Sequence, residues 1–359
     1  MRQVSSATIE SSPRTESSIR ESLSRQPLIL FAVIFVVAAF AYSFRLGNDP
    51  LGATEAYSAW AAAKPGVGAI VRTPVPHDPG KQVLYYVVLH YYTLIFGLSE
   101  ISLRSMSVIF SLMTLTLVFA LGREMFDDNT ALAAAAMWAF NPLAMVFAHT
   151  ARMYPMLVAL ALAQLLMLQQ VRSRPSIKGG IGCGILGAAL PYTHLTGLLI
   201  LGAEGAILLR DLVHGKRATV AWMAIVLAIV LFIPYLPIAI RQSQDLMYGH
   251  SLDYLGPSHG YPLGAKVAAG LVATGLCWWL IFGRAVEPGA GEPIRLLAAW
   301  IGLPALAFVA GSVILHPMFN LRYLSPEIAA ASLLIAGGVA LVSVKWRNLL
   351  AAGFALVCL

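Results

Sequence analysis

The stretch that decides the fold is residues 27–44, PLILFAVIFVVAAFAYSF, in which no side chain carries a charge. At about 1.5 Å per residue, a helix of this length nearly spans the roughly 30 Å hydrocarbon core of a bilayer. Similar apolar runs recur along the rest of the chain, separated by short polar segments. The sequence therefore predicts an all-α polytopic membrane protein with about 10–11 transmembrane helices.

We predict further apolar runs along most of the remaining chain. They lie at residues 82–98, 101–121, 129–148, 153–171, 179–191, 195–209, 218–240, 263–283, 296–315, 328–344 and 348–359. The last run covers only about 18 Å as a helix, so we expect the chain to stop within a helix or to be truncated in its C-terminal part. Residues 1–26 are rich in Ser, Arg and Glu, and we expect them to form a disordered cytoplasmic tail before one transmembrane domain, residues 27–359.

Composition excludes a soluble globular protein. The 359 residues include only 24 basic and 17 acidic ones, 58% are hydrophobic, and mean hydropathy is +0.76. So few charges cannot cover a core of this size. The net charge of +7 does not indicate nucleic-acid binding, because the basic residues stand singly between apolar runs and are typical of loops on the inner side of a membrane. Cys183, Cys277 and Cys358 lie within apolar runs, where we expect them to pack in the membrane core.

The basic loops also set the topology. If every run crossed the membrane from an inside N-terminus, the two densest short basic loops would lie outside, against the positive-inside rule. These loops contain Arg172, Arg174 and Lys178, and Arg210, Lys216 and Arg217. One run must therefore not cross. We select residues 82–98, because the run is short and holds a histidine and four tyrosines. It is predicted to be a juxtamembrane helix in a first periplasmic loop, residues 45–100.

That first loop holds the richest polar sequence. Its segment Thr54-Glu55-Ala56-Tyr57 begins a predicted interfacial helix. Thr54 can cap this helix with Glu55 in its first turn, where the helix dipole favours an anion. Alternatively, Glu55 is a general base or a metal ligand in a cavity at the membrane surface. Both readings stay open from the sequence.

Two more acid, base or cation candidates follow in His77-Asp78-Pro79-Gly80-Lys81. Asp78 can cap the next helix in a proline-built turn, or it can act in acid–base catalysis. Lys81 is a candidate for binding a phosphate.

Arginine–tyrosine pairs occur at two other predicted outer positions, Arg152 with Tyr154 and Arg322 with Tyr323. Such arginines either reach to lipid headgroups or bind a phosphate with their planar fork. His194 is either a hydrogen-bonded structural residue or a ligand.

Two intramembrane features have structural explanations. Glu204 lies in an apolar run with no basic neighbour in sequence, so we expect a neutral, hydrogen-bonded side chain. Gly180 and Gly184 form a GxxxG motif that favours close helix packing. Metal ligands stay unassigned, although His77, His194, His250 and His259 on the outer side can contribute to a divalent metal site.

The ordered series of motifs resembles a known family. The series runs from Glu55-Ala56-Tyr57 through Leu84-Tyr85-Tyr86, Glu100 with Arg104, Ala151-Arg152-Met153-Tyr154 and Tyr192-Thr193-His194 to Arg322-Tyr323. It is similar to the GT-C class of polytopic membrane glycosyltransferases, in particular the bacterial relatives of protein O-mannosyltransferases and lipid A aminoarabinose transferase.

This resemblance implies a GT-C helical domain that transfers a sugar, with inversion, from a polyprenyl-phosphate donor to an acceptor. The active face would be periplasmic, on the inner membrane of a bacterium. It implies Glu55 as the catalytic base with Asp78 as its substitute, and a divalent metal as a candidate cofactor. The implied substrate-binding residues are Lys81, Arg104, Arg152, Tyr154, His194, Arg322 and Tyr323.

The sequence departs from the family where the first loop usually carries Asp-Glu, since the pair here is Thr54-Glu55. An alternative hypothesis is therefore a non-catalytic GT-C protein that binds a lipid-linked glycan. A transporter or flippase is a third hypothesis, but it predicts inverted repeats that the sequence lacks. The expected partners are the lipid-linked donor and membrane lipids, not nucleic acid, and the sequence leaves the oligomeric state open.

Overall fold

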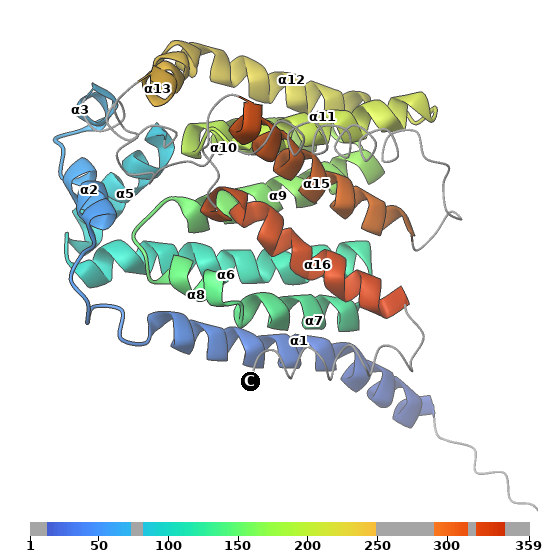
Figure 1. Cartoon of the computed structure of the whole chain (residues 1–359). Helices are drawn as coiled ribbons and strands as arrows, with labels where there is room; N and C mark the ends of the chain where they lie inside the picture. The colour runs from blue at the N-terminus through green and yellow to red at the C-terminus, as the bar shows by residue number, and fades with distance from the viewer. Residues whose placement is uncertain (1–12, 73–81, 249–290, 315–320, 342–359) are drawn as a thin grey trace, which may run out of the picture.

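The structure is a computed structural model that describes residues 13–72, 82–248, 291–314 and 321–341, and these ranges contain helices and no β-strand (Figure 1). The longer helices are α1 (Pro13–Ser43), α6 (Glu100–Met125), α7 (Asp128–Ala139), α9 (Tyr154–Ser173), α10 (Ile177–Thr193), α11 (Gly197–Val213), α12 (Thr219–Phe232), α13 (Leu236–Tyr248), α15 (Gly291–Ile314) and α16 (Ser325–Leu341). The shorter elements are α2 (Ala53–Ala62), α3 (Val67–Arg72), α5 (Val83–Phe96), α8 (Pro142–Ala148), η1 (Ile233–Tyr235) and η3 (Leu321–Leu324). The predicted all-α class is confirmed.

Six stretches in the described ranges are long and apolar enough to cross a membrane. They are Gln26–Ser43, Glu100–Met125, Tyr154–Ser173, Thr219–Gln242, Gly291–Gly311 and Arg322–Ala340. Helices α7 and α8 meet at an angle of 61° and add a seventh if the bent pair is one span. Helices α10 and α11 are apolar but shorter, with 17 residues each. The predicted runs 263–283 and 348–359 lie outside the described residues. The chain is a multi-pass membrane protein.

The predicted non-crossing run forms α5, which has 14 residues. At about 1.5 Å per residue it extends only about 21 Å, less than a bilayer core. It packs against α2 and α3, and these three short helices lie together at one end of the long helices (Figure 1). This arrangement agrees with the expected juxtamembrane helices in the first loop.

Two helix starts differ from expectation. Helix α1 begins at Pro13, inside the segment 1–26 expected to form a tail, because extending an existing helix costs far less than nucleating one. The cap of α2 is Gly52 and not Thr54. The capping prediction for Thr54 is wrong because the Glu55 carboxylate itself accepts a hydrogen bond from the Gly52 amide at 3.0 Å.

Small residues bring the helices close together. A Cβ atom on Gly122 of α6 would lie 2.6 Å from the Cα atom of Ala131 in α7. A Cβ atom on Gly180 would lie 2.6 Å from Val220, and one on Gly184 would lie 2.7 Å from Leu227, both in α12. The GxxxG motif therefore packs α10 against α12, as expected.

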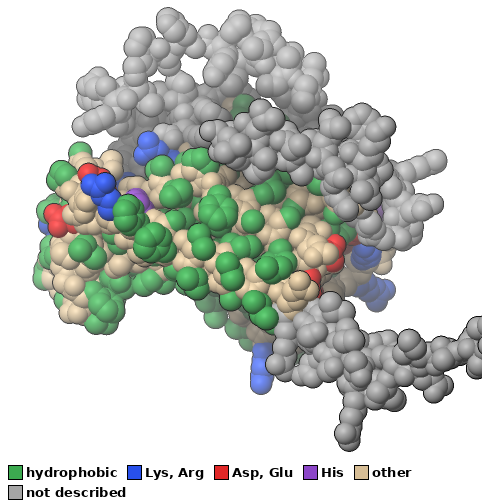
Figure 2. Space-filling model, turned by 90° about the horizontal axis from the view of Figure 1, so that it is seen from below, with side chains coloured by type: hydrophobic (Ala, Val, Ile, Leu, Met, Phe, Trp, Pro, Cys, Tyr) green, Lys and Arg blue, Asp and Glu red, His purple; other side chains and the backbone are tan. Residues whose placement is uncertain are grey.

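The outer surface fits a lipid environment. On α1, Val33, Val36 and Phe40 are exposed. Figure 2 shows apolar side chains across the face that contains α1, with charged side chains gathered toward the two ends. The end that carries α2, α3 and α5 also holds the start of α6 and α9, while the basic loops after α9 and α11 lie at the opposite end (Figure 1).

Candidate functional site

The site is built at the end of the bundle where the first loop meets α6 and the loop between α8 and α9. Arg104, in the second turn of α6, is 5% exposed. Its guanidinium donates to the backbone oxygens of Leu46 (2.9 Å), Asp49 (2.8 Å) and Pro50 (3.2 Å). One buried side chain thus fixes the path of the loop that enters α2.

The same guanidinium pairs with Glu55. Nε of Arg104 lies 2.9 Å from Oε1 of Glu55, and Nη2 lies 2.9 Å from Oε2, which is a bidentate pair. The backbone amides of Ala151 (2.8 Å) and Gly52 (3.0 Å) donate to the same two oxygens. Each oxygen of Glu55 therefore accepts two hydrogen bonds, from three separate parts of the chain.

This environment controls the acidity of Glu55. Burial raises the pKa of the Glu55 carboxyl, but the hydrogen bonds from Arg104, Ala151 and Gly52, together with the charge of Arg104, outweigh burial and hold its pKa below the ordinary value of 4.5. A carboxylate with a lowered pKa and four donors is a weak proton acceptor. The geometry of Glu55 and Arg104 suits an anchor for the first loop better than direct proton transfer.

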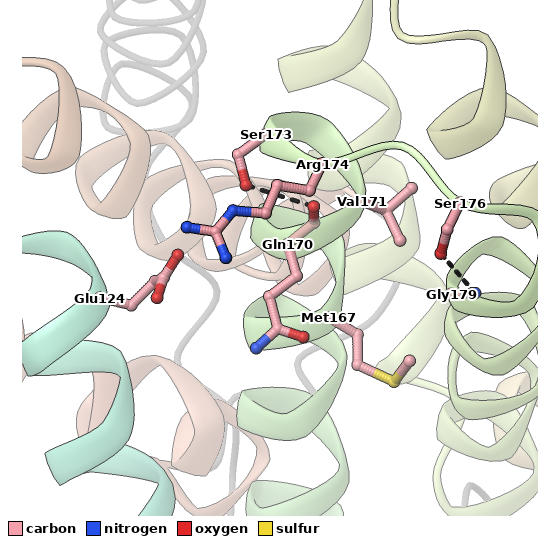
Figure 3. Close-up of a pocket in the computed structure, with 8 residues that line it drawn as sticks. All are labelled: Glu124, Met167, Gln170, Val171, Ser173, Arg174, Ser176 and Gly179. Atoms are coloured by element: carbon pink, nitrogen blue, oxygen red, sulfur yellow. Dashed lines mark hydrogen bonds between the residues drawn. The ribbon is translucent and has the colours of Figure 1, made fainter.

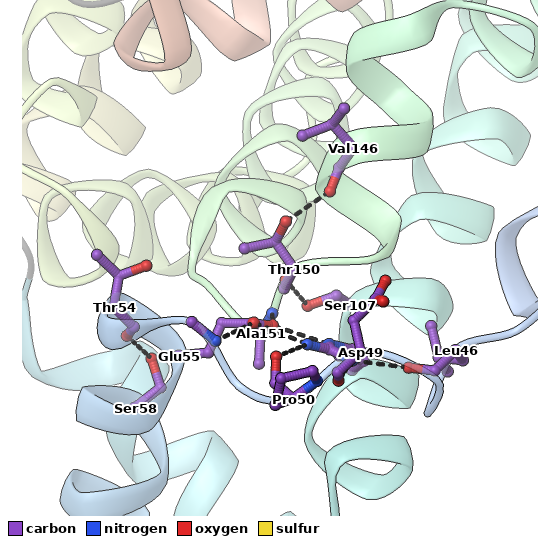
Figure 4. Close-up of polar contacts among 12 residues, drawn as sticks. Leu46, Asp49, Pro50, Thr54, Glu55, Ser58, Ser107, Val146, Thr150 and Ala151 are labelled. Atoms are coloured by element: carbon purple, nitrogen blue, oxygen red, sulfur yellow. Dashed lines mark hydrogen bonds and ion pairs between the residues drawn. The ribbon is translucent and has the colours of Figure 1, made fainter.

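Arg152 lies beside this anchor and is also buried, with 5% exposure. Its Nη1 donates to the backbone oxygen of Thr54 at 2.9 Å and contacts Oγ of Ser58 at 3.4 Å. Ser107 of α6 donates to the backbone oxygen of Thr150 at 2.8 Å (Figure 4). The loop before α9 is therefore held from both α2 and α6.

An aromatic cluster continues the site from Arg152 toward η3. The ring of Tyr154 lies 6.2 Å from that of His194 and 6.4 Å from that of Tyr323, and the last two rings are 5.0 Å apart. The guanidinium carbon of Arg322 lies 6.0 Å from the centre of the Tyr154 ring, at the limit for a cation–π contact. The structure thus brings together four predicted substrate-binding residues, from the start of α9, the residue after α10, and η3.

His194 has a defined hydrogen-bonding side. Its Nδ1 lies 2.9 Å from the hydroxyl of Thr196 and receives the Thr196 backbone amide at 3.3 Å. Because Nδ1 accepts from that amide, the neutral ring carries its proton on Nε2.

Other predicted site features are not placed. Asp78 and Lys81 lie outside the described residues, as do His77, His250 and His259. Within the part of the chain that the structure describes, no three His, Cys, Asp or Glu residues gather closely enough to hold a metal ion.

One residue that the sequence reasoning missed is Glu327, in the first turn of α16. Its side chain is 5% exposed, and in the described structure its Oε2 has no hydrogen-bond partner. The Glu204 carboxyl, in contrast, accepts hydrogen bonds from Nε2 of Gln164 at 3.0 Å and from Nε1 of Trp300 at 3.3 Å. These contacts confirm the expected hydrogen-bonded state. The sequence signal that could have identified Glu327 is an acidic residue at the start of an apolar run, where a charged side chain is costly.

One protein-family model matches part of the chain. Residues 81–238 match the family model of dolichyl-phosphate-mannose-protein mannosyltransferases. That range includes Arg104, Arg152, Tyr154 and His194. A search of proteins with curated functions gives no match.

The fold is similar to two solved glycosyltransferases. ArnT from Cupriavidus metallidurans, bound to undecaprenyl phosphate, is 16% identical with a TM-score of 0.62, over 93% of this chain and 63% of that one. The oligosaccharyltransferase from Archaeoglobus fulgidus, in a complex with Zn and sulfate, is 14% identical with a TM-score of 0.53, over 91% of this chain and 51% of that one. The chain thus spans less than two thirds of the length of either protein. The chain therefore has the fold of these GT-C type membrane glycosyltransferases, and its residues 81–238 resemble the mannosyltransferase family.

Proposed function

We propose that the protein transfers a sugar from a polyprenyl-phosphate donor to an acceptor, with inversion at the anomeric carbon. The observation that carries this proposal is the convergence of Tyr154, His194, Arg322 and Tyr323 beside the Arg152 loop. The fold shared with ArnT, whose structure contains undecaprenyl phosphate, supports a lipid phosphate as the donor's leaving group.

The reaction needs few groups. The oxygen of an acceptor hydroxyl attacks the anomeric carbon as the bond to the lipid phosphate breaks, and a carboxylate takes the hydroxyl proton. Negative charge develops on the leaving phosphate and must be met by fixed cations. Arg322, exposed beside the Tyr154 ring, is the first candidate for this contact, and Lys81 is the second. Arg152 is a buried cation in the same region, and its guanidinium contacts the Thr54 backbone oxygen and the Ser58 hydroxyl.

We assign a positioning role to Glu55 and Arg104, because the carboxylate can accept a proton only by giving up a hydrogen bond it already makes. Asp78 and Glu327 are then the candidate proton acceptors. Glu327 is the carboxyl four residues after Tyr323, one helical turn farther along the chain.

We further propose that this end of the bundle is periplasmic, in a bacterial inner membrane. The argument is the positive-inside rule, since the basic loops after α9 and α11 lie at the other end. Cysteine labelling tests it: cysteines introduced at Ser99 and Ser173 are expected to react with an impermeant reagent from outside and from inside, respectively. Labelling of position 99 from inside overturns this topology.

The activity is tested with the purified chain and a radiolabelled polyprenyl-phosphate sugar. We expect transfer by the wild type, and a loss of at least about tenfold in Arg322→Ala, because one phosphate contact is removed. Arg217→Gln, an exposed arginine at the opposite end, is the matched control and should keep full activity. Equal activity in Arg322→Ala and the wild type would contradict the assigned phosphate contact.

A non-catalytic donor-binding protein is the second candidate, because Thr54 occupies a position where the family usually has Asp and Glu55 is fully hydrogen-bonded. It predicts donor binding without turnover in the wild type. Thr54→Asp separates the two candidates further, since a gain of transfer would show that the chain lacks only this acid.

A further inference from the structure

The end of the bundle opposite the candidate site contains a cavity of about 370 Å³ between the C-terminal ends of α6 and α9 and the start of α10. Its volume lies near the lower limit for small-molecule sites, and a single water takes only about 30 Å³ of liquid volume. Six lining residues matter here: Glu124, Met167, Val171, Ser173, Arg174 and Ser176 (Figure 3).

Two opposite charges face this cavity without pairing. The Glu124 carboxylate and the Arg174 guanidinium point toward each other in Figure 3. Within the described ranges, neither side chain forms a hydrogen bond or an ion pair. They therefore present one negative and one positive group to whatever enters.

An adjoining cavity of about 190 Å³ gives the contrast, since it shares Glu124 and Ser173 but also faces Arg172 and Glu292. Arg172 is bound to Asp211 at 2.6 Å, and Glu292 lies 3.2 Å from Lys216. Apart from Glu124, the charges around the smaller cavity are already neutralised by the protein. The larger cavity is thus the one in which a positive and a negative side chain are both available to bind a ligand.

The two serines add a donor and an acceptor. Ser176 Oγ accepts the Gly179 amide at 3.1 Å, so its hydroxyl hydrogen is available to donate. Ser173 donates its hydroxyl to Gln169 at 3.0 Å or to Gln170 at 3.2 Å, so the lone pairs of its oxygen are available to accept. Arg174 and Ser176 therefore offer donors, while Glu124 and Ser173 offer acceptors.

The cavity is polar at its rim and apolar toward the membrane. Met167 lies seven residues before Arg174, about 10 Å along α9 toward the middle of the bundle, and Val171 lies between them. An amphiphile fits this gradient, with its headgroup at Arg174 and its glycerol and first methylenes over Met167 and Val171.

We propose that this cavity binds the headgroup of a phospholipid that carries both a phosphate and a primary ammonium, as phosphoethanolamine does. Arg174 and Ser176 hold the phosphate, and Glu124 and Ser173 hold the ammonium. A purely anionic headgroup leaves Glu124 unpaired and near a phosphate. A trimethylated headgroup cannot donate hydrogen bonds to Glu124. This inference does not rest on the proposed transferase function.

The test uses the full chain in nanodiscs that contain equal amounts of phosphatidylethanolamine, phosphatidylglycerol and phosphatidylcholine. Native mass spectrometry then counts the lipids that stay bound. We expect enrichment of phosphatidylethanolamine on the wild type and about tenfold less in Arg174→Gln, which loses a charge-assisted contact. In Glu124→Gln the preference over phosphatidylglycerol should disappear. Arg217→Gln, at the same end, and Glu100→Gln, at the other, are the matched charge controls and should match the wild type.

Arg174→Lys and Glu124→Asp keep the charges and should retain part of the preference, which separates loss of binding from loss of folding. Competition by free phosphoethanolamine, with the same dependence on Arg174 and Glu124, would identify a soluble ester as the source of the shared chemistry. Two results would overturn the proposal. One is equal lipid retention in the wild type and both neutral variants, and the other is equal retention of all three lipids.

Discussion

Among the described residues, an arginine–carboxylate pair with little exposure lies at each end of the bundle, and the two pairs have different structural roles. Counting side-chain atoms alone, Arg104 and Glu55 are 6% and 8% exposed, and Arg172 and Asp211 are 11% and 4% exposed. Arg172 joins two helices, α9 and α11, by 2.8 and 2.6 Å contacts to one oxygen of Asp211. Arg104 also holds three backbone oxygens of a loop. The same chemistry ties helices at one end and shapes an irregular segment at the other, where the candidate site lies.

The sharpest way to break this comparison is Arg104→Ala. It leaves the Glu55 carboxylate buried without a cation and leaves three loop carbonyls without their donor, so we expect a loss of about 3–5 kcal/mol in unfolding free energy. The midpoint of thermal unfolding in detergent measures the loss. Donor binding should disappear as well, because the loop no longer fixes α2. Retained donor binding at wild-type affinity would contradict the anchoring role.

Arg172→Ala should have the next largest effect. The substitution leaves the Asp211 carboxylate without its cation. Because Arg172 is slightly more exposed than Arg104, we expect a loss of about 3 kcal/mol in unfolding free energy. Sugar transfer measured below the unfolding midpoint should stay close to wild type, since this pair lies at the other end of the bundle. A selective loss of transfer would show that the two ends are coupled.

Lowering the pH should weaken the Glu55 end. The folded pKa of Glu55 lies below its ordinary value of 4.5, so the interaction stabilises the fold fully above pH 4.5 and is lost as the pH falls through the folded pKa. Thermal unfolding of the wild type and Glu55→Gln between pH 7 and pH 3 measures this. The difference between the two proteins should shrink as the pH drops below 4.5, and a constant difference would contradict the lowered pKa.

The smallest effect is expected from Asp128→Asn. Asp128 pairs with Arg123 at 2.6 Å, but the two side chains are 40% and 44% exposed. Water screens such a pair, so we expect less than about 1 kcal/mol by thermal unfolding. A cost as large as that of Arg172→Ala would mean that burial does not explain the ranking of these pairs.

Much of the fold was predictable because it depends on the local composition of the chain. Runs of apolar residues such as 101–121 specify membrane helices without reference to any other part of the chain. The short, tyrosine-rich run 82–98 was predictable as a non-crossing helix because charge in distant loops constrains topology. The cap of α2 was not predictable, because Gly52 and Thr54 lie two residues apart and both are acceptable N-cap residues.

The candidate site was predictable as a set of residue types but not as an arrangement. Arg152, Tyr154, His194, Arg322 and Tyr323 could be named from their motifs. That Arg104 is committed to Glu55, 49 residues away, could not be. Glu327 shows the same limit, because whether a buried acid has a partner depends on which helices surround it.

The sequence by itself determined that this is an all-α membrane protein with its polar chemistry at the helix ends, because hydropathy and charge act residue by residue. Only the tertiary structure decided which charges meet. In the folded chain, Glu55 accepts hydrogen bonds from Arg104 and from the Ala151 amide, which are 49 and 96 residues away in the sequence. Glu124 and Arg174 instead face an open cavity. The physical reason is range: burial of an apolar helix follows from its own side chains, whereas an ion pair exists only where packing brings two distant groups within about 4 Å.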